Sequence, residues 1–206
     1  MKTILQINAS LFTEDGQSSR LADQLVAELR RQYPGAEVIV RDLARAPVPH
    51  LDAARFGAFL ATLESRTPAQ QAVLNYSDEL IDELRRADVI VLGLPMYNFG
   101  VPSQLKAWID HVARAGITFK YTEKGAVGLL AGKKVYVLAT RGGRYAGTSG
   151  DYQTPYVRQF FAFLGITDVE FIYAEGLAMG ETAKNEALAA AQSVIHGLAG
   201  RQRVAA

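Results

Sequence analysis

The sequence predicts an α/β protein, a doubly wound parallel sheet of five strands in the order 2-1-3-4-5 with helices on both faces. Short apolar runs alternate with longer amphipathic segments along the whole chain, as in such folds. The run Val-Ile-Val-Leu at 89–92 has no polar side, so we expect a central strand covered on both faces. The 206 residues, 49% hydrophobic and 21% charged, suit one globular domain, residues 1–206.

The first half of the chain supplies three strands and two helices. We expect strands at 4–7, 37–41 and 89–92, where apolar and β-branched residues gather between turn residues. Ser18 opens an amphipathic helix that ends before Pro34-Gly35. A second helix begins at Thr67-Pro68 and leads to Asp88, and the Pro-rich stretch 47–49 interrupts the alternation before it.

The second half continues the alternation after one irregular stretch. Ser103 can cap a helix that carries apolar residues as far as Val112. Residues 117–130 look like a hairpin and a loop, longer than a simple connector requires. The remaining elements are strands at 135–138 and 169–173 and helices at 156–164 and 182–198.

Composition excludes several classes of partner and site. Lys and Arg total 22 against 21 Asp and Glu, so no overall field favours nucleic acid or an anionic membrane. Without cysteine the chain has no disulfide, thiolate nucleophile or Cys-ligated metal, and His50, His111 and His196 lack metal-ligand spacing. No signal peptide is visible in residues 1–7, and no apolar run reaches the ~18 residues of a membrane span. We therefore expect a cytoplasmic protein without a metal.

Three loops follow strands one, three and four and should meet at one edge of the sheet. They are the first loop (residues 10–19), the second loop (95–102) and the third loop (140–143), and all hold small, polar or Gly residues. Ligands of doubly wound sheets bind at the carboxyl ends of the strands. The turns of the opposite edge, at 34–35, 85–88 and 131–133, look like solvated connectors.

The first loop favours a phosphate. Gly16-Gln17-Ser18-Ser19 stands at a helix start, where free N–H groups and the helix dipole favour an anion. Phosphate-loop and dinucleotide signatures are absent, so a monophosphate is expected. The alternative is that Ser18 is a simple N-cap.

The second and third loops favour a flat aromatic ligand. Met96, Tyr97 or Phe99 could cover a ring while backbone amides bond its edge. Gly142 and Gly143 permit close backbone approach, and Arg141 could offset negative charge on a reduced ring. The alternatives are aromatic residues that fill the core and an ordinary glycine turn.

These residues resemble the FMN-dependent NADH-azoreductase and NAD(P)H quinone reductase family of flavodoxin-like enzymes. The similarity rests on Ser10 with Gly16 to Ser18, on Met-Tyr-Asn-Phe-Gly at 96–100 and on Arg-Gly-Gly at 141–143. It implies a homodimer with one FMN per subunit near the interface. By this resemblance the FMN-binding residues are Ser10, Gly16, Gln17 and Ser18 at the phosphate, Pro95, Met96, Tyr97, Asn98 and Phe99 at the isoalloxazine, and Thr140, Arg141, Gly142 and Gly143 at its other edge.

The same resemblance implies that Phe119, Tyr121 and Phe163 line a substrate pocket, partly from the partner subunit. The alternative for Phe163, beside Phe160 and Phe161, is plain core packing.

The implied activity is FMN-dependent NADH:quinone oxidoreductase or azoreductase. Because the cofactor carries the chemistry, we expect no catalytic acid or base. We expect a ping-pong cycle in which NADH or NADPH delivers hydride to flavin N5, leaves, and is replaced by a planar quinone or azo compound. The alternative is a flavodoxin-type electron carrier, against which stand the near-neutral charge and the 117–130 insertion. A signalling receiver domain would need acidic residues where this chain has Asn8-Ala9-Ser10.

Overall fold

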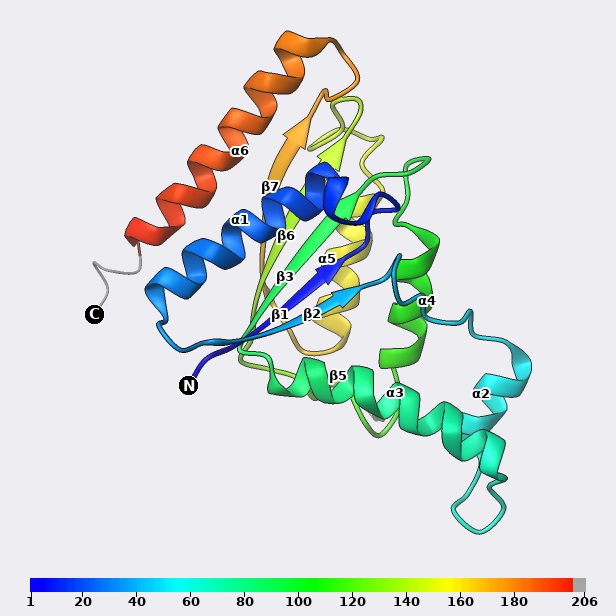
Figure 1. The fold of residues 1–206 in the computed structure, drawn as a ribbon. Coiled ribbons are helices and arrows are strands. Elements are labelled where there is room, and N and C mark those ends of the chain that lie inside the picture. Colours follow the sequence, from blue (N-terminus) through cyan, green and yellow to red (C-terminus); the bar gives the residue numbers. More distant parts are fainter. Residues whose placement is uncertain (202–206) are drawn as a thin grey trace.

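The computed structural model describes residues 1–201 and contains a five-stranded parallel sheet (Figure 1). Its order is β2-β1-β3-β6-β7, which is the predicted order 2-1-3-4-5 when only the strands of this sheet are counted. The strands are β1 (Thr3–Asn8), β2 (Glu37–Asp42), β3 (Val89–Pro95), β6 (Lys134–Arg141) and β7 (Asp168–Glu175). Every pairing is parallel, so all carboxyl ends meet at one edge.

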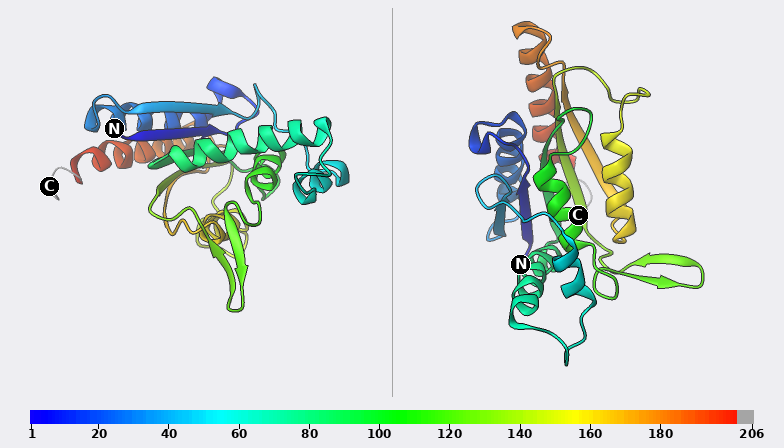
Figure 2. Two further views of the ribbon diagram at one scale, coloured as in Figure 1. Left: turned by 90° about the horizontal axis from the view of Figure 1, so that it is seen from below. Right: turned by 90° about the vertical axis from the view of Figure 1, so that its right-hand side faces the viewer.

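Helices cover both faces of the sheet (Figures 1 and 2). Alternate residues of a strand point to opposite faces, so Ile4 and Val91 belong to one buried cluster and Leu5 and Ile90 to another. The first cluster is closed by α1 (Gln17–Gln32) and α6 (Glu181–Arg201). The second is closed by α3 (Pro68–Arg86), α4 (Ser103–Val112) and α5 (Gln153–Phe163).

One helix was not predicted. The Pro-rich interruption leads into α2 (Ala53–Leu60), which lies against α3. Asp52 begins this helix, since its carboxylate accepts the backbone N–H of Arg55 at 2.8 Å. Eight residues give too few turns for a helical period to stand out, although the capping Asp was a readable signal.

Three other helix starts also differ from prediction. The first helix starts at Gln17, one residue before the predicted Ser18, and α5 starts at Gln153, three before Tyr156. The last helix, α6, starts at Glu181, one residue before the predicted Thr182. Thr67 and Gln70 form the capping box of α3, in agreement with the start expected there.

The irregular stretch between α4 and β6 is a hairpin. β4 (Phe119–Thr122) pairs antiparallel with β5 (Gly125–Gly128), outside the main sheet. The hairpin projects from the body of the molecule (Figure 2). This confirms the hairpin expected within 117–130.

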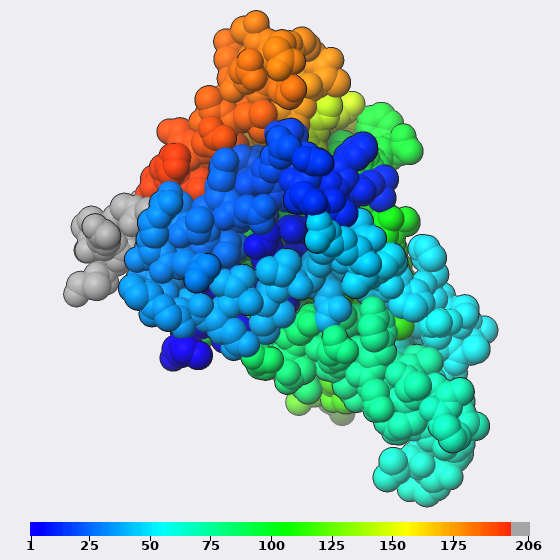
Figure 3. Space-filling model, viewed as in Figure 1, coloured from blue at the N-terminus to red at the C-terminus, as the bar shows by residue number. Residues whose placement is uncertain are grey.

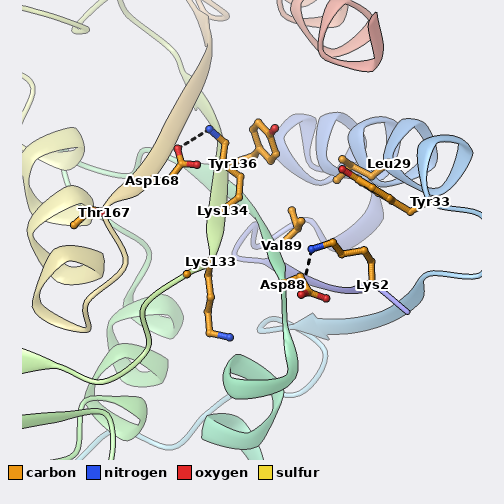
Figure 4. Close-up of a pocket in the computed structure, with 11 residues that line it drawn as sticks. Lys2, Leu29, Tyr33, Asp88, Val89, Lys133, Lys134, Tyr136, Thr167 and Asp168 are labelled. Atoms are coloured by element: carbon orange, nitrogen blue, oxygen red, sulfur yellow. Dashed lines mark hydrogen bonds and ion pairs between the residues drawn. The ribbon is translucent and has the colours of Figure 1, made fainter. Parts of the chain in front are cut away.

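The amino edge of the sheet is more structured than the predicted solvated connectors. A pocket of about 390 Å³ lies there, and Figure 4 shows the side chains that line it. Lys133 Nζ donates to the carbonyls of Arg85 at 2.8 Å and Ala87 at 2.6 Å, at the end of α3. Lys2 pairs with Asp88 and Lys134 with Asp168. Two of the three lysines in this pocket are paired with carboxylates, and the ammonium of the third, Lys133, is held by two carbonyl oxygens.

Candidate functional site

The second and third loops meet at the carboxyl edge of the sheet. Pro95 and Thr140 are register partners at the ends of β3 and β6, and Met96 N–H donates to the Thr140 carbonyl at 2.9 Å. Beyond them lies a cavity of about 250 Å³. Its lining residues are Met96, Asn98 and Phe99 from the second loop, Gly142 and Gly143 from the third, and Tyr145 just beyond it. The predicted meeting of these two loops is confirmed.

The first loop lies beside the second. The backbone N–H of Leu11 donates to the hydroxyl of Tyr97 at 3.3 Å. In the space-filling view the first loop, in dark blue, adjoins the green second loop at the surface (Figure 3). All three loops therefore gather at one corner of the molecule.

The first loop is packed tightly on the start of α1. Gly16 is the N-cap residue, and a Cβ added to it would lie 2.1 Å from the Ser10 hydroxyl oxygen. A Cβ on Gly93 of β3 would lie 3.0 Å from the carbonyl oxygen of Ser18. Both close approaches need a residue without a side chain. They bring the helix start directly onto the edge of the sheet.

The hydroxyls at the start of α1 lack partners. Ser18 and Ser19 are buried, and neither side-chain oxygen has a hydrogen-bond partner within the described part of the chain. Ser18 is not the N-cap, so the simple capping alternative is wrong. Gly16 has no side chain to bond the first N–H groups of the helix. Orphaned hydroxyls, uncapped N–H groups and the positive end of the helix dipole together suit an anion such as phosphate.

The second loop contains a left-handed turn. Asn98 and Phe99 have φ of +48° and +67°, and mutual backbone hydrogen bonds between Tyr97 and Gly100 close the turn. This conformation costs a residue such as Phe roughly 1–2 kcal/mol, and such strain gathers at functional sites. The turn leaves the residue Phe99 52% exposed, and its ring is in edge contact with that of Tyr145 at 5.6 Å between centroids.

A residue that the sequence did not single out supports this loop. The side-chain amide of buried Gln153, at the start of α5, donates to the carbonyls of Pro95 and Gly100, both at 3.0 Å. These two carbonyls stand on either side of the strained turn. No local pattern distinguishes this glutamine from any other polar residue on a helix.

The Arg141 side chain is buried and does not line the cavity between the loops. Its guanidinium is 0% exposed, 3.0 Å from both Asp151 and Glu175, and lies 5.1 Å above the Tyr173 ring centroid. A fully buried and doubly paired cation has no surface to offer a reduced ring. This placement does not favour the charge-compensating role expected of Arg141, which stays a prediction, and the side chain instead supports the end of β6 and the third loop.

The three aromatic residues predicted to line a substrate pocket form a cluster elsewhere. The ring of Phe119 lies 5.4 Å from that of Tyr121 and 4.3 Å from that of Phe163. Phe119 and Tyr121 line a separate apolar cavity of about 550 Å³ together with α2. Phe163 also packs against the hydrophobic core, in agreement with the alternative of plain core packing. Within one chain these residues do not reach the cavity between the loops.

Two kinds of feature are absent from the described residues. No group of three or more His, Asp or Glu side chains there could hold a metal ion. In the same part of the chain, none of the helices has the length and apolar character that crossing a membrane requires.

Comparisons with known proteins agree with this geometry. A family model described as a flavodoxin-like fold matches residues 2–198. The chain is 60% identical over 190 residues to an FMN-dependent NADH:quinone oxidoreductase of Alcanivorax borkumensis, covering 92% of this chain and 96% of the relative. It is 54% identical over 195 residues to one of Burkholderia lata, covering 95% and 98%.

A solved structure shows the same fold. The FMN-dependent NADH-azoreductase of Bacillus anthracis, in complex with FMN, superposes with a TM-score of 0.89 at 28% identity. The match covers 98% of this chain and 99% of that one. The chain therefore belongs to the flavodoxin-like family of FMN-dependent NADH:quinone oxidoreductases and NADH-azoreductases.

Proposed function

We propose that this chain is an FMN-dependent NAD(P)H oxidoreductase that reduces quinones and azo compounds. The observation that carries the proposal is the meeting of three loops at one corner, with orphaned Ser18 and Ser19 hydroxyls at an uncapped helix start. A phosphate would satisfy these groups, and a planar ring would fit between the second and third loops. The relatives are named as NADH:quinone oxidoreductase and NADH-azoreductase, and a phosphate subsite beside a ring subsite is consistent with the FMN that both names include.

The residues present fit FMN in two parts. We assign its phosphate to Ser10, Gly16, Gln17 and Ser18, where the N–H groups and hydroxyls gather. We assign its ring to Pro95, Met96, Tyr97, Asn98 and Phe99 on one side and to Thr140, Gly142 and Gly143 on the other. When bound, FMN supplies hydride-transfer chemistry at its N5.

The backbone of this corner does the orienting and electrostatic work. Met96 N–H is already bonded to Thr140, so the N–H groups of Asn98, Phe99 and the two glycines are the ones left to face a ring edge. Fixed N–H dipoles favour negative charge beside them. Phe99 and Tyr145 both line the cavity, and their rings contact each other edge to face.

A homodimer is part of the proposal. Tyr121 is 75% exposed on the projecting hairpin, and its aromatic cluster is separated from the cavity of its own chain. Phe119, Tyr121 and Phe163 would then border the substrate position of a second subunit. Light scattering tests the assembly. A monomer that retains full quinone reductase activity contradicts this part.

One experiment tests the function as a whole. The purified protein is titrated with FMN, then mixed anaerobically with NADH or NADPH, and finally with a quinone or azo dye. We expect a yellow protein that loses its visible absorbance with reduced nicotinamide and regains it with the acceptor. Parallel double-reciprocal plots would show that donor and acceptor use the cavity in turn.

Two results contradict the proposal in different ways. A protein that stays colourless after FMN is added does not bind the cofactor. A yellow protein that shows no direct reduction by NADH or NADPH in stopped flow is an electron carrier instead. Assays with both nicotinamides and a panel of acceptors identify the preferred donor and acceptor. The expected cytoplasmic location stays a prediction, which cell fractionation tests.

A further inference from the structure

Glu175 lies at the carboxyl end of β7, a strand that contributes no residue to the predicted site. Its Oε1 accepts three hydrogen bonds: from Arg141 Nη1 at 3.0 Å and from the backbone N–H groups of Tyr145 and Ala146, both at 2.9 Å. The side chain is 15% exposed. One carboxylate oxygen thus joins the end of β6 to the segment that follows the third loop.

The neighbouring backbone holds the third loop from the same side. The N–H groups of Gly176, Leu177 and Ala178 donate to the carbonyls of Gly143, Arg141 and Gly142, at 2.9, 3.1 and 3.0 Å. These bonds use only carbonyl oxygens of the third loop. None of these bonds uses an N–H group of Gly142 or Gly143, both of which line the cavity.

The bonds of Glu175 determine where Tyr145 stands. Tyr145 lines the cavity, and its ring meets that of Phe99 across it. Its backbone N–H is bonded to Glu175, so a change in this carboxylate moves the ring as well as the loop. The glycines at 142, 143 and 147 give the segment little stiffness of its own.

Arg141 does not depend on Glu175 alone. Asp151 Oδ1 accepts Arg141 Nη2 at 3.0 Å and also the N–H of Thr154 at 3.0 Å. The buried guanidinium therefore keeps one carboxylate partner when Glu175 is removed. The contacts that only Glu175 makes are those to the Tyr145 and Ala146 N–H groups.

We propose that Glu175 is a positioning residue for the cofactor site, holding the third loop and Tyr145 in the geometry that binds the ring. The inference rests on the proposed FMN function. Glu175 acts through the segment it bonds and touches neither cofactor nor substrate.

The test compares two variants of Glu175 with a control on the same strand. In Glu175→Gln the carbonyl oxygen takes the place of Oε1 and accepts the same N–H groups, whereas Glu175→Met removes the acceptor. Glu170→Met is the control, because Glu170 also lies on β7 and pairs with a cation, Lys134, at 3.0 Å. FMN affinity of each apoprotein is measured by quenching of FMN fluorescence, and folding by thermal unfolding without FMN.

We expect Glu175→Met to weaken FMN binding by about tenfold or more, since hydrogen bonds to a charged group are lost at the loop. Glu175→Gln should remain within about threefold of the wild type, and Glu170→Met should not differ from it. The visible spectrum of bound FMN should change in Glu175→Met alone. Equal FMN affinity and spectra in Glu175→Met and Glu170→Met would overturn the inference, even if the apoprotein unfolds at lower temperature.

A second measurement needs no variant. In wild-type apoprotein the amide protons of Tyr145 and Ala146 should exchange with deuterium more slowly than that of Gly147. This measurement decides the matter if Glu175→Met does not fold. Exchange of the Tyr145 and Ala146 amide protons as fast as that of Gly147 would then overturn the inference. Failure of the proposed function is a separate result, because the wild type itself would then bind no FMN or accept no hydride.

Discussion

Gly16 and Ser10 are packed so closely that a Cβ on residue 16 would lie 2.1 Å from Ser10 Oγ and 2.5 Å from Ser10 Cβ. The first loop can fold back onto the start of α1 only because residue 16 has no side chain. The same packing leaves the first N–H groups of the helix without a side-chain cap. The tight loop and the proposed phosphate subsite thus have one physical origin.

Gly16→Ala should therefore impair the first loop. Overlap with Ser10 must be relieved by movement of the loop, at a cost of about 1–3 kcal/mol in the free energy of unfolding. FMN affinity should fall by about tenfold or more, because the phosphate donors move with the loop. Urea unfolding of the apoprotein and FMN fluorescence titration measure the two effects.

Gly57→Ala is the matched control. Gly57 lies within α2, and a Cβ there would have no atom within 4 Å. The substitution should raise stability by about 0.5–1 kcal/mol through helix propensity and leave FMN affinity unchanged. If both alanine variants bind FMN alike, the contact between Gly16 and Ser10 has no part in the site.

Bulky residues at the second and third loops should weaken FMN retention without unfolding the protein. Asn98→Leu puts a less suitable residue at φ +48°, where asparagine is tolerated. Gly142→Val adds methyl groups where a Cβ alone would already lie 3.3 Å from Ala178 Cβ. Gel filtration followed by the ratio of visible to ultraviolet absorbance measures retained FMN. Full retention with a native far-UV circular dichroism spectrum would refute the assignment of these loops.

The ion pair of Asp151 should make stability depend on acid pH. Burial acts to raise the pKa of Asp151, but hydrogen bonds from Thr154 and Arg141 outweigh it and lower the pKa below the ordinary 3.8. A lowered pKa in the folded state means that the contribution is complete above the unfolded value and is lost as pH falls through the folded one. At neutral pH the free energy of unfolding of the wild type should exceed that of Asp151→Asn by about 2 kcal/mol.

That difference should shrink as the pH falls below about 4. Urea unfolding of both proteins between neutral and acid pH measures it. A difference that stays constant over this range would show that the charge of Asp151 contributes nothing to folding.

Lys133→Met should lower stability without touching the cofactor site. Its ammonium bonds two carbonyls at the end of α3, so its loss should cost about 1–2 kcal/mol. Exposed Lys124 in the hairpin turn is the control, and Lys124→Met should change stability by less than about 0.5 kcal/mol. A drop in FMN affinity for Lys133→Met would mean that the amino edge of the sheet also affects the site.

The sequence by itself determined the sheet, its strand order and the edge at which the candidate site lies. Strands such as 89–92 can be recognised because burial on both faces removes every polar residue from a short run. Parallel strands then bring all the following loops to one edge, whatever their distance along the chain. For this reason the sequence alone is enough to group Ser10, Asn98 and Gly142. The helix α2 is too short for its helical period to be recognised in the same way.

Only the tertiary structure decided which side chains face the cavity and which support it. Arg141 looked like a ligand contact, but its charge is neutralised by Asp151 and Glu175, which lie 10 and 34 positions away. Gln153 bonds carbonyls more than 50 positions away. Such partners depend on how loops and strand ends pack together, and no local period or propensity encodes them. The hydrophobic pattern of the chain thus determines where the three loops meet, and long-range hydrogen bonds and ion pairs determine how their side chains are arranged.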